Sequence, residues 1–188
     1  MSKFKVTFQL DESDADYFRS LYRKAKKGAS DTDPEQIIQG ARDVVTRVRA
    51  SKKTPLFVID AISVLADLVD VVQDEAYAAP QKVKSEVLAA LAYFTNPEDL
   101  IPDHVPGLGF LDDALMVKFI EEEFKHELWG FRRFRDRRDG AEQRPWAKPG
   151  SERLQARLEA DRQRIRAEIE ERKAKEATKR KSGSYLGW

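Results

Sequence analysis

Apolar residues recur every three or four positions along most of this chain, which is the spacing of a helix with one buried face. Prolines, glycines and capping residues separate the apolar stretches. The pattern therefore predicts five principal helices, which cover about 12–27, from 34 towards Pro55, 56–75, 80–95, and from 112 or 113 through Phe131. The third has the widest apolar arc, so we expect it at the centre of the body.

The first residues follow a period of two instead. Lys5, Thr7 and Gln9 alternate with apolar residues, and this alternation predicts one half-buried β-strand. A lone strand must lie on the helices or pair with the same strand of a second copy. The predicted fold class is therefore an all-α, five-helix body with one N-terminal β-strand, and a homodimer through that strand is one alternative.

Two such strands, paired in a dimer and followed by helices, would resemble a ribbon-helix-helix DNA binder. Lys5, Thr7 and Gln9 would then face the bases. Seven acidic residues flank the first two predicted helices, however, and they would repel the phosphates. The favoured interpretation is thus a strand that packs on the body or forms a dimer.

The C-terminal part of the chain is more polar. Proline and tryptophan residues mark a linker over 140–150, and residues 151–181 are dense in Arg, Glu, Ala and Lys. Polar residues stand where the seam of a coiled coil needs apolar ones, at Asp161, Glu168 and Arg172. We therefore expect a solvated, extended charged helix. The predicted division is a helical domain over 1–139, the linker, and a charged helix with a flexible tail over 151–188.

The composition narrows the class of protein. Of the 188 residues, 41% are hydrophobic, 36% are charged and none is cysteine, which excludes disulfides, thiol nucleophiles and cysteine zinc sites. The N-terminus has no apolar stretch typical of a signal peptide. The most apolar run, 55–72, contains three aspartates and is too short and acidic to span a bilayer. We expect no transmembrane segment and a cytoplasmic protein, with peripheral attachment at a membrane as an alternative.

The net charge of +1 hides an asymmetry. Residues 1–131 carry 16 Lys+Arg and 23 Asp+Glu, whereas residues 132–188 carry 18 and 10. The basic end is the expected contact for nucleic acid or an anionic membrane surface. Aromatic residues accompany its first arginines, which are Arg132, Arg133, Arg135, Arg137 and Arg138. Interspersed acids favour a solvated helix end as the simpler interpretation.

Residues 96–113 interrupt the helical pattern with the sequence NPEDLIPDHVPGLGFLDD. Three prolines remove backbone donors and two glycines permit positive φ, yet six apolar residues make the stretch unlike an ordinary surface loop. We expect it to form the rigid apex of a hairpin between the fourth and fifth helices.

Acidic residues gather in this apex, and hard divalent cations such as Mg²⁺, Mn²⁺ or Ca²⁺ prefer oxygen ligands. One hypothesis is a metal site, with His104 as a further ligand, formed by Asp99, Asp103, Asp112 and Asp113. The favoured alternative gives all four a structural role, in which the first two close turns, the third caps the next helix and the fourth interacts with its dipole. Nothing in the sequence marks a nucleophile.

Glu123 and His126 form a Glu-x-x-His pair, which is the spacing used in carboxylate-bridged di-iron sites. Those sites need two such pairs, and the second histidine, His104, is not in one. A surface contact between glutamate and histidine is therefore the expected role.

The segment ALAYFTNPEDLIPDHVPGLGFLDDALMV resembles the YkvA-like family, a bacterial domain of unknown function, over about 87–117. The resemblance rests on the apex aspartates and on the motif positions Pro97, Leu100, Ile101, Pro102, Pro106 and Gly109. It implies a helical fold of this kind and no reaction. Other members of the family place the motif beside membrane-spanning helices.

These features favour a non-enzymatic interaction or scaffold module. The apex would provide a rigid surface, and the basic end would recruit an acidic protein partner, whose identity the sequence leaves open. A divalent-metal-dependent enzyme that uses the apex aspartates is the second alternative, and a nucleic-acid binder is the third.

Overall fold

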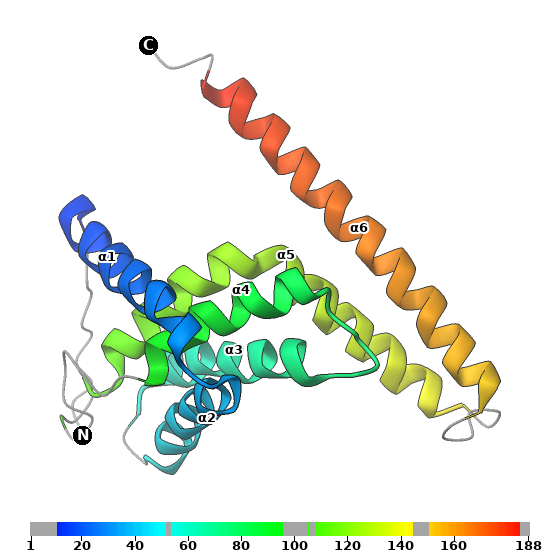
Figure 1. The fold of residues 1–188 in the computed structure, drawn as a ribbon, viewed down its shortest axis with the longest axis horizontal. Helices are drawn as coiled ribbons and strands as arrows, with labels where there is room; N and C mark the ends of the chain where they lie inside the picture. The colour runs from blue at the N-terminus through cyan, green and yellow to red at the C-terminus, as the bar shows by residue number, and fades with distance from the viewer. Residues whose placement is uncertain (1–10, 52–53, 96–104, 106–107, 145–150, 185–188) are drawn as a thin grey trace, which may run out of the picture. The chain divides into compact units, whose positions relative to one another are not determined.

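The computed structural model describes residues 11–51, 54–95, 105, 108–144 and 151–184. Its elements are, in chain order, α1 (Glu12–Gly28), the short η1 (Ala29–Asp31), α2 (Pro34–Ala50), α3 (Leu56–Gln73), α4 (Gln81–Leu91), the short η2 (Ala92–Thr95), α5 (Leu111–Glu142) and α6 (Glu152–Ser184) (Figure 1).

The fold class needs one correction. The residues that the structure describes form helices and no strand. The described part of the chain is therefore all-α, and the predicted fold class, an all-α body with an added N-terminal β-strand, is wrong for it. Residues 4–10, on which the strand was predicted, lie outside the described residues. The predicted helices are confirmed, with the fourth ending as the tighter η2 turn.

The first helices begin at the capping signals of the sequence. The carboxylate of Asp11 accepts the backbone N–H of Ser13 at 2.8 Å and that of Asp14 at 3.0 Å, which caps α1. Hydrogen bonds from the Ser13 hydroxyl and from these amides hold the pKa of Asp11 below its ordinary value. Asp33 accepts the N–H of Glu35 at 3.2 Å and caps α2 in the same way. Local chemistry thus fixes both starting points.

Contacts divide the chain into two compact units. Unit 1 comprises Met1–Ile62 and Leu88–Phe119, and unit 2 comprises Ser63–Val87 and Ile120–Trp188. The helices α3, α4 and α5 each contribute residues to both units. The division into domains and a linker that the sequence predicts stays a prediction, although α5 continues through the first residues of that linker to Glu142.

In unit 1, α2 and η2 approach so closely that no side chain fits between them at one point. A Cβ atom placed at Gly40 would lie 2.9 Å from the carbonyl oxygen of Phe94 and 3.2 Å from the Cα of Thr95. Only glycine permits this approach. Phe18 of α1 stacks on Phe119 of α5, with ring centroids 5.9 Å apart. The buried stripe of α2 completes the packing, with Ile37, Ile38, Ala41, Val44, Val45 and Val48.

In unit 2, α6 packs against α5 in the antiparallel direction. An ion pair of 2.6 Å joins Arg137, late in α5, to Asp161, early in α6. A second of 2.8 Å joins Lys125, earlier in α5, to Glu176, later in α6. Residue numbers therefore fall along α5 as they rise along α6.

This packing corrects the prediction that the C-terminal helix is solvated and single. A Cβ atom at Gly130 of α5 would lie 2.9 Å from Cγ1 of Ile169 and 3.2 Å from Cγ2 of Ile165. Both isoleucines of α6 are buried, with 1% and 0% of their surface exposed. The few apolar residues of α6 therefore pack against α5. The two helices can approach closely because Gly130 has no side chain.

A buried polar cluster lies in the same unit. The Tyr77 hydroxyl donates a hydrogen bond of 2.6 Å to Oε1 of Glu127, and Nη1 of Arg166 donates to the same oxygen. The guanidinium carbon of Arg166 lies 4.3 Å from the centroid of the Tyr77 ring. Burial and the Glu127 carboxylate raise the pKa of the Tyr77 phenol above its ordinary range. The charges of Glu127 and Arg166 compensate each other, which is the condition for burying the Glu127 carboxylate.

We predict that Gly40→Ala destabilises the protein by about 1–3 kcal/mol, because the new Cβ would push the η2 backbone away from α2. Gly140→Ala is the matched control, since Gly140 is also helical and a Cβ there would meet no atom within 4 Å. It should stabilise by up to about 1 kcal/mol through helix propensity. Urea unfolding followed by circular dichroism measures both, and equal effects would contradict the close approach at Gly40.

We predict that Arg166→Met lowers the free energy of unfolding by about 3 kcal/mol, because it leaves the Glu127 carboxylate, 4% exposed, without its cation. Arg164→Met makes the same change at an exposed position of α6 and should have an effect below about 0.5 kcal/mol. Chemical denaturation of the two variants measures the difference. Similar destabilisation by both would show that the cluster does not depend on this pair.

Candidate functional site

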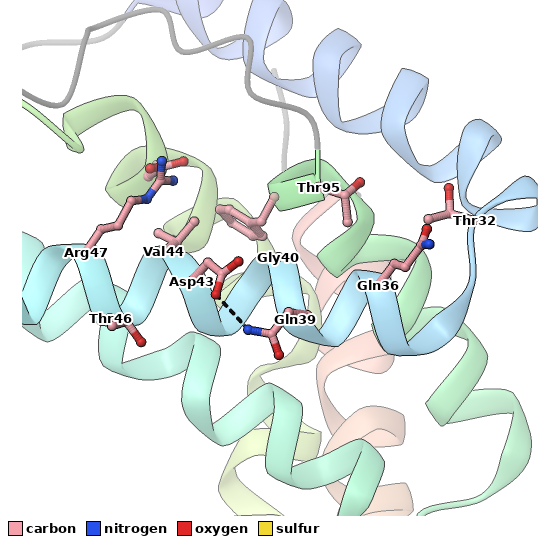
Figure 2. A pocket seen from close by; sticks show the side chains of 11 residues that line it. Thr32, Gln36, Gln39, Gly40, Asp43, Val44, Thr46, Arg47 and Thr95 are labelled. Carbon is pink, nitrogen blue, oxygen red and sulfur yellow. Dashed lines mark hydrogen bonds between the residues drawn. The ribbon is translucent and has the colours of Figure 1, made fainter.

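A pocket of about 770 Å³ opens in unit 1. Residues of α2 form one side, and residues of η2 and the first turn of α5 form the others (Figure 2). Polar side chains dominate its lining, among them Thr32, Gln36, Gln39, Asp43, Arg47 and Thr95. The pocket is therefore suited to hydrogen-bonding a polar ligand.

The helical repeat explains the α2 side of the pocket. Gln36, Gln39, Asp43 and Arg47 are three or four residues apart, so they lie on one face of the helix. Nε2 of Gln39 donates a hydrogen bond of 2.7 Å to Oδ1 of Asp43 (Figure 2). Gly40 also lines the pocket, at the point where η2 lies directly against the α2 backbone.

The α5 side of the pocket begins at a residue with an unusual backbone. Phe110 has a φ of 65°, which residues other than glycine rarely adopt and which costs about 1–3 kcal/mol. Its ring is buried, and the guanidinium carbon of Arg47 lies 5.9 Å from the ring centroid. The Val105 carbonyl accepts the N–H of Leu108 at 3.2 Å and that of Gly109 at 2.8 Å. This turn and the buried ring hold Phe110 and set the direction in which α5 leaves.

The two ends of the predicted apex meet at this pocket. Thr95 directly precedes the apex and Asp113 is its last residue, and both line the pocket. Asp112 and Asp113 are 4% and 8% exposed and lie in the first turn of α5, where carboxylates interact favourably with the helix dipole. Because α5 begins at Leu111, Asp112 lies inside the helix and is not the cap that the sequence predicts.

Eight of the predicted apex and motif positions lie outside the described residues, namely Pro97, Asp99, Leu100, Ile101, Pro102, Asp103, His104 and Pro106. The rigid apex and its hairpin therefore stay a prediction. The same holds for the metal site, since two of its four predicted ligands are in this group.

Within the part of the chain that the structure describes, no group of three acidic or histidine side chains is placed to hold a metal ion. His126, from the Glu-x-x-His pair, has its Nε2 atom 2.6 Å from Oε2 of Glu176 in α6. The other carboxylate oxygen of Glu176 accepts a hydrogen bond of 2.8 Å from Lys125. The contact of His126 is therefore with α6, and it helps to hold the two helices together.

The five arginines predicted to bind a polyanion all lie beside carboxylates, three of them next to Asp67 of α3 or Asp74, which directly follows α3. Asp67 is 2.6 Å from Arg132 and 2.7 Å from Arg135, and Asp74 pairs with Arg138. The hydrogen bond that Arg135 donates to the Asp67 carboxylate raises the pKa of Arg135. A phosphate would have to replace these carboxylates, and polyanion binding here stays a prediction.

The other two arginines face α6. Arg137 pairs with Asp161 at 2.6 Å, and Arg133 lies 3.2 Å from Glu168. The guanidinium carbon of Arg172 lies 4.2 Å from the centroid of the Trp129 ring. The three polar positions that argue against a coiled-coil seam thus all contact α5.

Sequence reasoning missed the α2 side of the pocket. Gln36, Gln39 and Arg47 have the spacing of an ordinary solvated helix face. The one available signal was Gly40, because a glycine within a helical stripe costs about 1 kcal/mol and often marks a close backbone approach.

None of the helices in the described ranges combines the length and apolar character needed to cross a lipid bilayer.

Comparison with known proteins covers the segment that borders the pocket. Residues 83–119 match a family described as "Protein of unknown function (DUF1232)". A curated relative from Bacillus subtilis (strain 168), described as "Uncharacterized membrane protein YkvA", is 43% identical over 47 residues, which are 25% of this chain and 44% of the relative. The aligned part thus spans less than half of that relative, and no solved structure matches the chain significantly. The predicted resemblance is confirmed, because residues 83–119 of this chain are similar to the YkvA-like family of DUF1232 proteins, whose function is unknown.

Proposed function

We propose that this protein is a non-enzymatic interaction module, and that its unit 1 pocket receives an extended, polar segment of a partner protein. The observation that carries the proposal is the chemistry of the pocket lining. An extended peptide presents both N–H donors and C=O acceptors, and its partner must satisfy both.

The lining supplies both kinds of group. The amides of Gln36 and Gln39 each offer a donor group and an acceptor, and the hydroxyls of Thr32 and Thr95 can do either. Phe94 adds an apolar surface on which a side chain of the partner can rest. The bound peptide would lie along the stripe of α2 that also carries Asp43.

The family segment supports the same pocket. Residues 83–119 include η2 and the start of α5, which contribute Phe94, Thr95 and Asp113 to the lining. The pocket therefore combines family residues with the residues of α2, so that related chains with a different α2 would select different partners.

The accompanying localisation is cytoplasmic with peripheral contact at a membrane. The peripheral contact is supported by the relative, which is described as a membrane protein. The proposed localisation does not depend on the chemistry of the pocket.

We predict that the double variant Gln36→Ala with Gln39→Ala binds its protein partner about tenfold or more weakly than wild type, because it removes two hydrogen-bonding amides from the pocket. The measurement is quantitative co-purification from the native host, followed by titration of the recovered partner against each variant. Gln163→Ala is the matched control, since Gln163 is an exposed amide of α6 in unit 2.

Wild type and Gln163→Ala should bind the partner equally well, and the double variant should not. This result would support the pocket as the binding site. A partner retained at full affinity by the double variant would rule the pocket out as its binding site. Thermal unfolding of the three proteins would show that the loss does not come from misfolding.

A second candidate, a divalent-cation site that serves a metal-dependent reaction, is favoured by the burial of Asp112 and Asp113 beside the pocket. Two adjacent carboxylates at 4% and 8% exposure are stabilised by a cation as well as by the helix dipole.

This candidate predicts that Mg²⁺, Mn²⁺ or Ca²⁺ at a hundred times its dissociation constant adds about 2.7 kcal/mol to the free energy of unfolding. The double variant Asp112→Asn with Asp113→Asn should lose that gain, whereas Asp139→Asn, at an exposed acid of the same helix, should keep it. Thermal unfolding with each cation and with a chelator measures the gain. No shift with any of the three cations would leave the two aspartates with a structural role only.

A further inference from the structure

Two large apolar side chains project from the start of α3. Leu56 is 77% exposed and Phe57 is 51% exposed, and both belong to unit 1. Among the described residues, the other exposed large hydrophobic side chains are Tyr17 on α1 and Leu108 before α5. Leu56 and Phe57 are adjacent and together expose more apolar surface than either of these, and we call the pair the apolar corner.

The apolar corner is held by a defined backbone. The carbonyl of Pro55 accepts the N–H groups of Val58 at 3.0 Å and Ile59 at 3.2 Å, which starts the helix. The Thr54 hydroxyl reaches back 3.5 Å to the carbonyl of Val48 in the last turn of α2. Val58, directly after the corner, is 1% exposed and anchors the opposite face of the helix. The corner is therefore a fixed projection next to the end of α2.

The surroundings of the apolar corner are basic. The last turn of α2 carries Arg47, which lies over the Phe110 ring, and Arg49, which is exposed, and the first turn of α3 carries no acid. Asp60, one turn into α3, is the nearest acid that follows. The N-terminus of α3 adds a partial positive charge at the corner itself.

An apolar projection with a basic surround fits the surface of an anionic lipid bilayer. The apolar side chains enter the boundary between headgroups and acyl chains, and the cations contact the phosphates. A second copy of the chain would need a complementary surface of about 800 Å² on each partner, far more than two side chains provide. A bilayer needs no such complementary shape, so it is the occupant that the observations favour.

We propose that the apolar corner docks this protein on an anionic membrane surface, with Leu56 and Phe57 inserted and Arg49 at the headgroups. The inference goes beyond the protein-binding pocket and does not depend on it. It also differs from contact through the arginines of α5, which pair with carboxylates.

We expect wild-type protein to float with vesicles of phosphatidylcholine and phosphatidylglycerol, and to bind vesicles of phosphatidylcholine alone about tenfold or more weakly. The double variant Leu56→Ser with Phe57→Ser should bind the anionic vesicles about tenfold or more weakly than wild type, because it removes the inserted apolar surface. Both positions are exposed, so the fold should tolerate the change. Arg49→Gln should weaken binding to anionic vesicles only, and added salt should reduce its effect.

Tyr17→Ser is the matched control, since Tyr17 is 49% exposed and lies on α1, and it should bind as wild type does. The double variant Gln36→Ala with Gln39→Ala should also bind normally, which separates this test from that of the pocket. No flotation of wild type with anionic vesicles would overturn the proposal, as would equal flotation of the Leu56→Ser, Phe57→Ser variant. A wild-type dimer in analytical ultracentrifugation that this variant dissociates would also overturn it, in favour of a second copy as occupant.

Discussion

The contact between the backbone of α2 at Gly40 and the backbone of η2 at Phe94 and Thr95 determines the architecture of unit 1. Backbone atoms on both sides leave no flexible side chain to move aside, so the separation of these elements is set by glycine itself. Thr95, at this contact, directly precedes the predicted apex, and the positive φ of Phe110 directs the start of α5. Thr95, directly before the predicted apex, and Asp113, its last residue, line the pocket together with one face of α2.

The sequence predicts the helices of this fold well because their determinants are local. Asp11 and Asp33 cap the helices that follow them, and the apolar stripe of α2 is the buried one. Determinants that lie far apart in the chain could not be predicted in this way. Nothing near Gly40 in sequence shows that Phe94 will lie against it, and a phenylalanine gives no sign of a positive φ. The polar lining of the pocket was hidden for the same reason, because a lining residue and a solvated residue have the same helical spacing.

The C-terminal helix shows how a correct rule can lead to a wrong conclusion. Polar residues at seam positions weaken a coiled coil when the facing helix is apolar. Here the facing helix carries arginines and an aromatic ring, so Asp161, Glu168 and Arg172 find partners, and α6 is packed. The charge asymmetry of the chain is also partly explained by internal ion pairs. Asp67 and Asp74, from the acidic portion, pair with arginines of the basic portion. An excess of one charge along the sequence can therefore complete an internal network as well as attract a partner.

The family match separates what this chain shares with its relatives from what it adds. Residues 83–119 lie mostly in unit 1 and contribute η2, Phe110 and the buried aspartates of α5. The α5–α6 packing and the cluster of Tyr77, Glu127 and Arg166 lie in unit 2, outside that match. A function common to the family must therefore use groups of the matched segment, and the pocket is where described groups of that segment face an opening. The apolar corner and α6 lie outside the matched segment, so any role they have belongs to this chain and to relatives that share them.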